Sequence, residues 1–577
     1  MPWRCTQSHE QDARLSISSV PFFASCSRRP TDDSGILVYC SFEFPNYACH
    51  KKKMTDFNLA LDFVATVRHY PNRLALSVDG IDYSYQELGD KVARTAAWLH
   101  SQEIATGSRV GILACRSIET YIGVLAACWV GATYVPVNAT IPPQALVGIL
   151  EAARLHALIV DKQGLAALTN SVMDVCPQKV LAPAPSVVGN PPARPSLDWI
   201  RDWEDLQSLE PLAGPCAMAP DSTAYIEPTS GSTGAPKLVM IPASAVVHFL
   251  SMMQERYRIN SDDRVAATSD ITFDIAVFNM FLAWKAGASL HVVPRTQIVA
   301  PAKFIREKEI SIWFSVPSIA AFMGRMRMLA PGSFPHLRHS MFAGESLSLD
   351  SAVRWQAAAP NSTVENLYGP TEATVVCTVE RIGEHPGVTP GRGVIPIGRP
   401  LPGTGVAVLG PDYSFLSVGE PGQIALSGPQ LAQGYFGQPE LTKERFPTIQ
   451  GTRWYLTGDL GYQDALGVFH HLGRVDNQVK VLGNRVELEE IESHLRLICG
   501  SEMVAVVPWP VDHGSAQGLV AFVSGTDCAT SDVIAAMRSR VPNYMVPGAI
   551  RVLEALPLNA NGKVDRRELE RMLAAQS

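Results

Sequence analysis

The chain has 577 residues, of which 46% are hydrophobic and 18% are charged, so it can bury the cores of roughly four compact units. Its net charge is −7 and no basic face stands out, which argues against a nucleic acid as partner. The 11 cysteines show no Cys-x-x-Cys pair and no zinc-ligand spacing, which predicts reduced, buried thiols in a cytoplasmic protein.

The first 53 residues differ in composition from the rest of the chain. They hold four of the 11 cysteines and two clusters of Arg and Lys, without a hydrophobic period. Met54 then opens a segment that is typical of a chain start followed by an amphipathic helix. We predict that residues 1–53 are a disordered extension or a mis-assigned start, and their acidic residues make a transit peptide a weaker interpretation.

Residues 54–474 alternate helical runs with short β-rich runs. Strands are expected at Val110–Leu113, His156–Val160 and Ile310–Phe314. Prolines interrupt the uncharged stretch over 120–150, so we predict a buried helix near 118–130 and a strand over 133–137 instead of a membrane span. The alternation predicts an α/β fold, with a large N-terminal domain of several layered subdomains.

The pattern changes after Arg474. A helix over 487–498 has one apolar face, and strands over 503–507 and 518–523 follow it. A second helix near 531–540 and a last strand near 550–556 complete the segment. These elements predict that residues 475–577 form a separate, small α+β domain at the C-terminal end.

Nine residues, Thr229–Lys237, interleave four hydroxyl side chains with two glycines and end in a lysine. Glycines let successive N–H groups point at one anion, while hydroxyls add donors and the lysine adds a positive charge. The segment lies between apolar runs at 224–226 and 238–241, which is where a ligand-binding turn between two strands is expected. We predict a polyphosphate-binding loop, with a Ser/Gly-rich surface turn as the alternative. The residues assigned to the phosphates are Thr229, Ser230, Gly231, Ser232, Thr233, Gly234 and Lys237.

Four further motifs follow in order: Tyr368–Glu372, Tyr455–Asp459, Gly473–Asp476 and Asn561–Lys563. Each is weak alone, since a Gly-Asp pair is usually only a turn. Together with the phosphate loop, the chain resembles the adenylate-forming superfamily of acyl-CoA synthetases and luciferases. It is most similar to the amino-acid adenylation domains of nonribosomal peptide synthesis, and the resemblance covers nearly everything past Met54.

The resemblance implies ATP and Mg²⁺ as cofactors and assigns catalytic roles. Lys237 would contact the β- and γ-phosphates, Thr371 the α-phosphate, and Glu372 would bind Mg²⁺. Lys563 matches the family's C-terminal catalytic lysine, and a solvated turn lysine is the alternative. Asp476 falls where the family keeps the hinge of a mobile C-terminal domain, whose segments 478–480 and 483–485 would swing in when a thiol attacks.

The resemblance also assigns the nucleoside. Tyr368 would stack on adenine, and Asn366 would bond the exocyclic amine. Asp459 would accept both ribose hydroxyls, with Arg474 beside it. For Asp459 the alternative is a helix N-cap.

The segment Phe273–Phe278 matches the part of the family that supplies an aspartate for the substrate's α-ammonium. Asp274 suits that role because a desolvated ammonium needs a paired charge, and the alternative is a buried cap of the helix that follows. The remaining wall positions carried over are Ile275, Phe278, Ser315, Met341, Ala343, Leu367, Val375 and Val376. They predict that the substrate amino acid has a small, neutral side chain. Alanine is the first candidate, and proline, valine and leucine remain possible substrates.

The chain departs from the family where Glu227 and Pro228 replace the usual aliphatic-aromatic pair before the loop. After Lys563 only 564–577 remain, without a phosphopantetheine serine motif, so the expected partner is a separate carrier protein. A membrane is not expected as a partner. The resemblance thus implies an amino-acid:carrier-protein ligase. An acyl-CoA ligase for an acid without an amine is the alternative, which Asp274 disfavours. A non-catalytic ATP-binding regulator is a third hypothesis.

Overall fold

A computed structural model describes most of the chain. The described residues are 56–183, 200–230, 236–476, 478–512, 515–525, 528–558 and 564–575. The predictions for residues 1–53, for Gly231–Gly234 and for Lys563 therefore lie outside the described residues. The chain divides into two compact units, Met1–Thr55 and Asp56–Ser577, and only the second is considered below.

Two large, mostly parallel sheets form the frame of the N-terminal part. The nine-stranded sheet runs, in spatial order, β16 (Arg399–Pro400), β15 (Thr378–Arg381), β14 (Thr363–Tyr368), β13 (His339–Phe342), β12 (Ile312–Ser315), β10 (Arg264–Ala267), β11 (Ser289–Val292), β1 (Leu74–Val78) and β2 (Ile81–Ser84). The eight-stranded sheet runs β19 (Gly434–Tyr435), β9 (Lys237–Pro242), β8 (Thr223–Thr229), β4 (Thr133–Pro136), β3 (Arg109–Leu113), β5 (Ala157–Val160), β6 (Val180–Ala182) and β7 (Ile200–Asp202).

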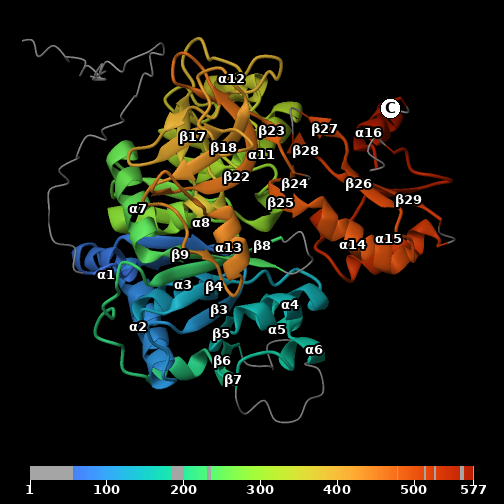
Figure 1. Ribbon diagram of the computed structural model, residues 1–577. Helices are drawn as coiled ribbons and strands as arrows, with labels where there is room; N and C mark the ends of the chain where they lie inside the picture. The colour runs from blue at the N-terminus through green and yellow to red at the C-terminus, as the bar shows by residue number, and fades with distance from the viewer. Residues whose placement is uncertain are drawn as a thin grey trace, which may run out of the picture. The chain divides into compact units, whose positions relative to one another are not determined.

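The main hydrophobic core contains residues of both sheets and of the helices packed with them. These helices are α1 (Ala60–His69), α2 (Tyr85–Ser101), α3 (Ile118–Trp129), α7 (Ala243–Tyr257), α8 (Ile275–Val277), the π-helical turn η3 (Phe278–Leu282) and α9 (Ala283–Ala286). Two further cores cover the opposite faces of the sheets. One packs α4 (Pro143–Ala153), α5 (Lys162–Ala167) and α6 (Asn170–Met173), which Figure 1 shows gathered beside β5, β6 and β7. The other packs α10 (Ala302–Glu307), α11 (Pro317–Arg325) and α12 (Leu349–Ala358), so helices and sheets alternate in layers.

A smaller antiparallel sheet follows, in the order β17 (Gly405–Leu409), β18 (Gly422–Ser427), β22 (Tyr455–Gln463) and β23 (Phe469–Arg474). Between its strands lie α13 (Pro439–Arg445) and the hairpin β20 (Thr448–Ile449) and β21 (Thr452–Arg453). The 3₁₀ turns are η2 (Glu204–Ser208), η4 (Arg295–Gln297), η5 (Thr371–Ala373) and η6 (Asn543–Met545).

The C-terminal part has its own sheets and cores. One sheet runs β25 (Asn484–Glu487), β24 (Gln478–Val481), β28 (Ser515–Ala516) and β27 (Val511–Asp512), and the other runs β26 (Val504–Pro508), β29 (Leu519–Ser524) and β30 (Ala549–Leu553). Helices α14 (Leu488–Cys499) and α15 (Thr530–Arg538) pack in one core and α16 (Arg566–Ala574) in another. Figure 1 draws this part in orange and red. The large layered N-terminal part and the small C-terminal part of helices and sheets confirm the predicted fold class.

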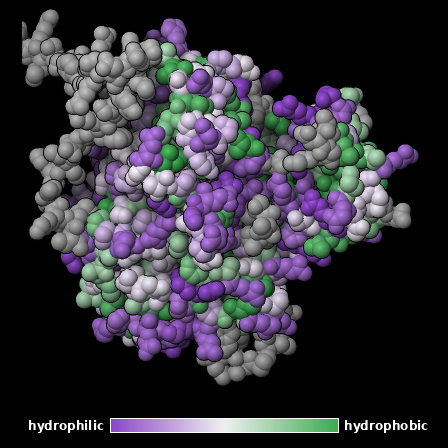
Figure 2. All heavy atoms as spheres, viewed as in Figure 1, coloured by the Kyte–Doolittle hydropathy of each residue, from purple (hydrophilic) through white to green (hydrophobic). Residues whose placement is uncertain are grey.

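The uncharged stretch has the predicted local structure. Helix α3 is buried along its length, β4 ends at Pro136, and Pro143 opens α4, where a missing N–H is tolerated. Within the described residues, no helix is both long enough and apolar enough to cross a membrane. Figure 2 shows hydrophilic and hydrophobic residues intermixed over the visible face.

Candidate active site

One cavity of about 800 Å³ gathers much of the predicted site. It lies at the ends of β8 and β14, beside β22, and is closed by residues of the β24–β25 hairpin. The predicted residues that line it are Thr229, Ser230, Asp274, Ile275, Ala343, Asn366, Leu367, Tyr368, Thr371, Val375, Asp459, Arg474 and Asp476.

Three of the residues predicted to bind the nucleoside form one hydrogen-bonded group. The Tyr368 hydroxyl donates to Oδ2 of Asp459 at 2.5 Å, and Nη1 of Arg474 donates to Oδ1 at 2.6 Å. Burial alone would raise the pKa of Asp459, but Arg474 and His471 outweigh burial and hold that pKa below its ordinary value. Asp459 lies in strand β22, so the helix N-cap alternative is wrong. The result is an ionised, fixed acceptor, as recognition of ribose hydroxyls requires.

Asn366 sits deeper in β14. Its amide nitrogen donates to the carbonyl of Pro396 at 2.7 Å, which fixes the orientation of the amide. Its Oδ1 is buried and has no hydrogen-bond partner within the described ranges. A free acceptor on a cavity wall suits the predicted contact with an exocyclic amine.

Glu372, the predicted Mg²⁺ ligand, is fully buried and paired with a residue of the C-terminal part. Nη1 of Arg485 donates to Oε2 at 2.8 Å and to Oε1 at 3.1 Å, and the Tyr435 hydroxyl donates to Oε1 at 2.9 Å. Burial alone would raise the pKa of Glu372, but Arg485 outweighs it and lowers the pKa to about 2. An ionised carboxylate fits a hard divalent cation, although here the arginine occupies both oxygens.

Lys237, the predicted phosphate-binding lysine, is also paired with the hairpin. Its Nζ donates to Oε1 of Glu487 at 2.6 Å, and the amide of Gln478 donates to the same oxygen at 2.7 Å. The Ser230 hydroxyl donates to the carbonyl of Arg485 at 2.9 Å. The β24–β25 hairpin therefore contacts both the group assigned to the metal and the group assigned to the phosphates.

The turn of this hairpin approaches the large part closely. Gly483 has φ +83°, and a Cβ placed on it would meet Cγ1 of Val316 at 3.0 Å. Only a glycine suits both this conformation and this spacing. The approach brings Lys480, Gly483 and Asn484 to the cavity wall.

Asp274, the residue predicted to bind the α-ammonium, stands directly before α8 and lines the cavity. Within the described residues its side chain makes no capping hydrogen bond, which disfavours the alternative of a helix cap. Burial raises its pKa to about 6, although Lys480 and the Thr371 hydroxyl act in the opposite direction. A buried carboxylate that is costly to ionise alone is suited to a cationic ligand.

The predicted wall residues separate into three groups. Asp274, Ile275, Ala343, Leu367 and Val375 line the cavity, and Ser315 lines a neighbouring one. Phe278, Met341 and Val376 are not among the described residues that line either cavity; each is buried in the main core. Their aromatic and aliphatic packing was not readable from the sequence.

The wall segment after β14 has a strained backbone. Thr374 and Val375 have φ of 55° and 69°, values that β-branched residues rarely adopt. The side-chain amide nitrogen of buried Gln430 lies within hydrogen-bond distance of three carbonyls, those of Ala373 at 3.3 Å, Thr374 at 3.2 Å and Val376 at 2.9 Å. These bonds hold the segment in place against the strain.

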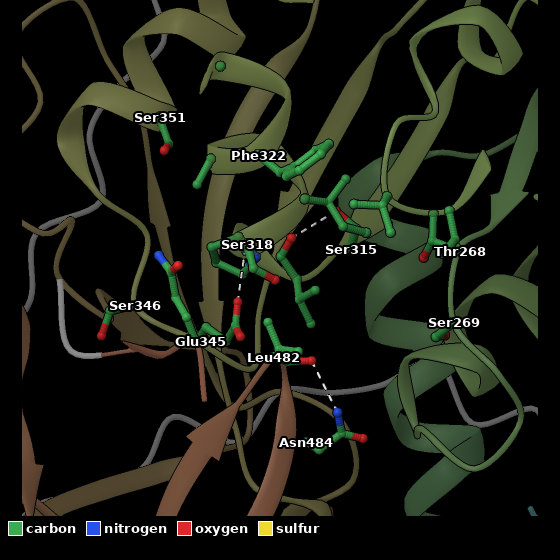
Figure 3. A pocket seen from close by; sticks show the side chains of 18 of the residues that line it. Thr268, Ser269, Ser315, Ser318, Phe322, Glu345, Ser346, Ser351, Leu482 and Asn484 are labelled. Atoms are coloured by element: carbon green, nitrogen blue, oxygen red, sulfur yellow. Dashed lines mark hydrogen bonds between the residues drawn. The ribbon is translucent and has the colours of Figure 1, made fainter. Parts of the chain in front are cut away.

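A second cavity of about 640 Å³ adjoins the first. The two share lining residues such as Ile275, Val316 and Glu345. In Figure 3, Ser318 and Phe322 come from α11 and Leu482 and Asn484 from the hairpin, and Glu345 accepts from the Ser318 N–H at 2.9 Å. The second cavity is thus bounded by both parts of the chain.

Sequence reasoning assigned no role to Glu227. Its side chain is 3% exposed, lines the first cavity, and has an Oε1 without a partner among the described residues. An acidic residue after the apolar run at 224–226 was the signal that could have identified it.

The large part, the small part and the cavity lined by residues of both define the architecture. Comparison with known proteins shows the family. Residues 63–436 match the AMP-binding enzyme family, and residues 490–563 match the AMP-binding enzyme C-terminal domain. The chain belongs to this family of AMP-binding enzymes.

Among its relatives is the L-proline--[L-prolyl-carrier protein] ligase of Pseudomonas fluorescens, 32% identical over 516 residues, which are 88% of this chain and 98% of that protein. The delta-poly-L-ornithine synthetase of Acinetobacter baumannii is 30% identical over 538 residues, 90% of this chain but 37% of that protein. The chain spans 44% of tyrocidine synthase 1 of Brevibacillus parabrevis, with 30% identity over 509 residues, which are 87% of this chain. A crystal structure of the Vibrio cholerae adenylation domain AlmE, in complex with glycyl-adenosine-5'-phosphate, matches with a TM-score of 0.80 and 32% identity, covering 92% of this chain and 100% of that one.

Proposed function

We propose that this protein activates an amino acid with ATP and transfers the aminoacyl group to the phosphopantetheine thiol of a separate carrier protein. In the first step a carboxylate oxygen attacks the α-phosphorus and pyrophosphate leaves. In the second the thiol sulfur attacks the carbonyl carbon and AMP leaves. The observation that carries the proposal is that one cavity is lined both by Asp274, the carboxylate proposed to bind the α-ammonium, and by the Asp459–Arg474 pair.

The chain's own residues divide the work of the first step. Asp459 and Tyr368 would orient the nucleoside, Lys237 would neutralise phosphate charge, and Lys563 would stabilise the charge that develops at the α-phosphorus. Glu372 would hold Mg²⁺, which screens the phosphates when it is bound. We assign these roles on the family resemblance and on the positions of the described residues.

The pairing of Arg485 and Glu487 with Glu372 and Lys237 supports a second arrangement for thiol transfer. While the hairpin makes these contacts, the groups assigned to Mg²⁺ and to the phosphates are occupied, so the two steps exclude one another. The second cavity is lined by residues of the hairpin and shares Phe273 and Ile275, the neighbours of Asp274, with the first cavity, which suits the narrow arm of a phosphopantetheine group. Asp476, which pairs with Arg474 between β23 and β24, is the proposed hinge, and 474/475 is the proposed boundary between the domains.

The lining residues Ile275, Ala343, Leu367 and Val375 favour a small, neutral side chain, with alanine as the first candidate. The names of relatives mention proline, ornithine and glycine, so they support an amino acid as substrate without selecting one. We propose the cytoplasm as location, since all seven cysteines of the described residues are thiols and four of them are buried.

Amino-acid-dependent pyrophosphate exchange tests the proposal. A panel of free amino acids and of matched carboxylic acids without an amine should give exchange with at least one amino acid and with none of the amine-free acids. Exchange with an amine-free acid and formation of its CoA thioester would support the acyl-CoA ligase instead. Absence of exchange with every acid, while ATP still binds, would support the non-catalytic regulator.

A further inference from the structure

Glu227 occupies a place where a charge is costly. It lies in β8 two residues after Tyr225, so both side chains point to the face of the sheet that packs in the main core, while Ile226 packs in the core of the opposite face. The Glu227 side chain is 3% exposed, and its Oε1 is without a hydrogen-bond partner in the described part of the chain. A buried, unpartnered carboxyl group destabilises the fold unless a ligand pairs with it.

The surroundings of Glu227 supply further polar groups, and Lys480, a cation that lines the same cavity, acts on Asp274. The rings of Tyr134 and Tyr225 stack with centroids 5.3 Å apart, and each hydroxyl is buried without a partner among the described residues. Burial raises the pKa of Glu227 well above its ordinary value, and the carboxylates of Asp274 and Asp270 raise it further. Burial and these carboxylates therefore favour the neutral form of Glu227, and a cation beside it would lower the pKa of Glu227 and favour the ionised form.

Glu227 and Asp274 line the same cavity and interact electrostatically. One α-ammonium carries one positive charge, which Asp274 alone balances. When the β24–β25 hairpin with Lys480 leaves the cavity, as the proposed function requires for the first step, a second carboxyl group on the wall finds a counter-charge if the ligand carries a second cation. Since an aliphatic side chain would fill this apolar strand at lower cost, the carboxyl group is best explained by its ligand.

We propose that Glu227 is a specificity-determining residue that binds a second ammonium group, and that the substrate is a short diamino acid. The inference rests on the proposed function and replaces the neutral side chain that the other wall residues favour. Asp274 binds the α-ammonium, Glu227 binds the side-chain ammonium, and the apolar residues between them contact the intervening methylene groups. The buried Tyr134 and Tyr225 hydroxyls lie on the same face of the sheet, behind the cavity wall that Glu227 lines.

The test measures pyrophosphate exchange with matched pairs of substrates. Each of 2,3-diaminopropionate, 2,4-diaminobutyrate and ornithine is compared with the neutral amino acid of the same chain length. Wild-type kcat/KM should favour one diamino acid over its neutral partner by about tenfold or more, the worth of a hydrogen bond between charged groups. Glu227→Gln should lower kcat/KM for that diamino acid by a similar factor and change the neutral one less than about threefold. Glu227→Ile should reverse the preference.

Asp270→Asn is the matched control, because it removes a nearby carboxylate that lines the second cavity, and it should keep the preference for the diamino acid. Thermal melting and the KM for ATP show whether each variant is folded. A wild-type preference for neutral amino acids, or an equal effect of Glu227→Gln on both members of every pair, overturns the inference while the proposed function stands. Absence of exchange with all amino acids overturns the proposed function itself.

Discussion

Replacing Arg485 by alanine should separate the two steps of the proposed reaction. The substitution leaves the fully buried Glu372 carboxylate without its cation whenever the hairpin is in place. Arg485 is the main group that holds the pKa of Glu372 at about 2 against the effect of burial. Loss of one partner of a buried ion pair costs about 3–5 kcal/mol. The hairpin-in arrangement should therefore become at least about a hundredfold less populated.

The assay measures each step alone. Arg485→Ala should keep amino-acid-dependent pyrophosphate exchange within about threefold, while transfer from preformed aminoacyl-AMP to pantetheine should fall about a hundredfold. Arg485→Lys, which retains a positive charge that can approach both carboxylate oxygens as Nη1 does, should lose less. Arg571→Ala is the control, because that arginine is 70% exposed and lies on α16. An equal loss in both steps, or a loss only in exchange, would refute the reasoning.

Four further results are expected. Asp274→Ala should reduce amino-acid kcat/KM in pyrophosphate exchange about a hundredfold or more with the KM for ATP unchanged, since an unpaired ammonium costs about 3–5 kcal/mol; unaltered activation would point to a different ammonium partner. Because the ionised form of Asp274 binds the ammonium and its pKa is about 6, wild-type kcat/KM for the amino acid should fall about tenfold per pH unit below that value, and a flat profile would contradict the assignment. Lys563→Ala should cut adenylate formation about a hundredfold and affect thiol transfer far less, as measured by exchange and by transfer from preformed adenylate; equal losses would exclude a role confined to the first step. A chain that begins at Met54 should match the full chain in melting temperature and turnover, and a clear drop in either would show that the first 53 residues contribute.

Local patterns predicted the fold well because hydrophobic period and proline placement act over short distances. Helix α14 spans Leu488–Cys499, one residue from its predicted bounds, and β4 ends within one residue of prediction. The pair of strands flanking the phosphate loop was also predicted, and β8 and β9 are antiparallel neighbours.

The sequence was less informative where contacts join distant segments. The pairings of Glu372 with Arg485 and Lys237 with Glu487 cross 113 and 250 positions, and no local pattern encodes them. Phe278 was expected on the pocket wall, yet it opens the π-helical turn η3 and packs in the core against Phe314, with ring centroids 5.2 Å apart. The sequence identified Glu227 only as a departure from the family pattern, because the role of its carboxyl group depends on the residues that surround strand β8.

The strained segment at Thr374 and Val375 has a consequence for redesign of the pocket. Its backbone shape depends on Gln430, which is distant in the sequence and does not line the cavity among the described residues. Variants in which only the cavity side chains are exchanged would therefore keep the same loop conformation. A bulkier residue at position 375 would have to adopt backbone angles that it disfavours. Libraries that vary Gln430 together with the wall positions would sample loop shapes that single-site changes cannot reach.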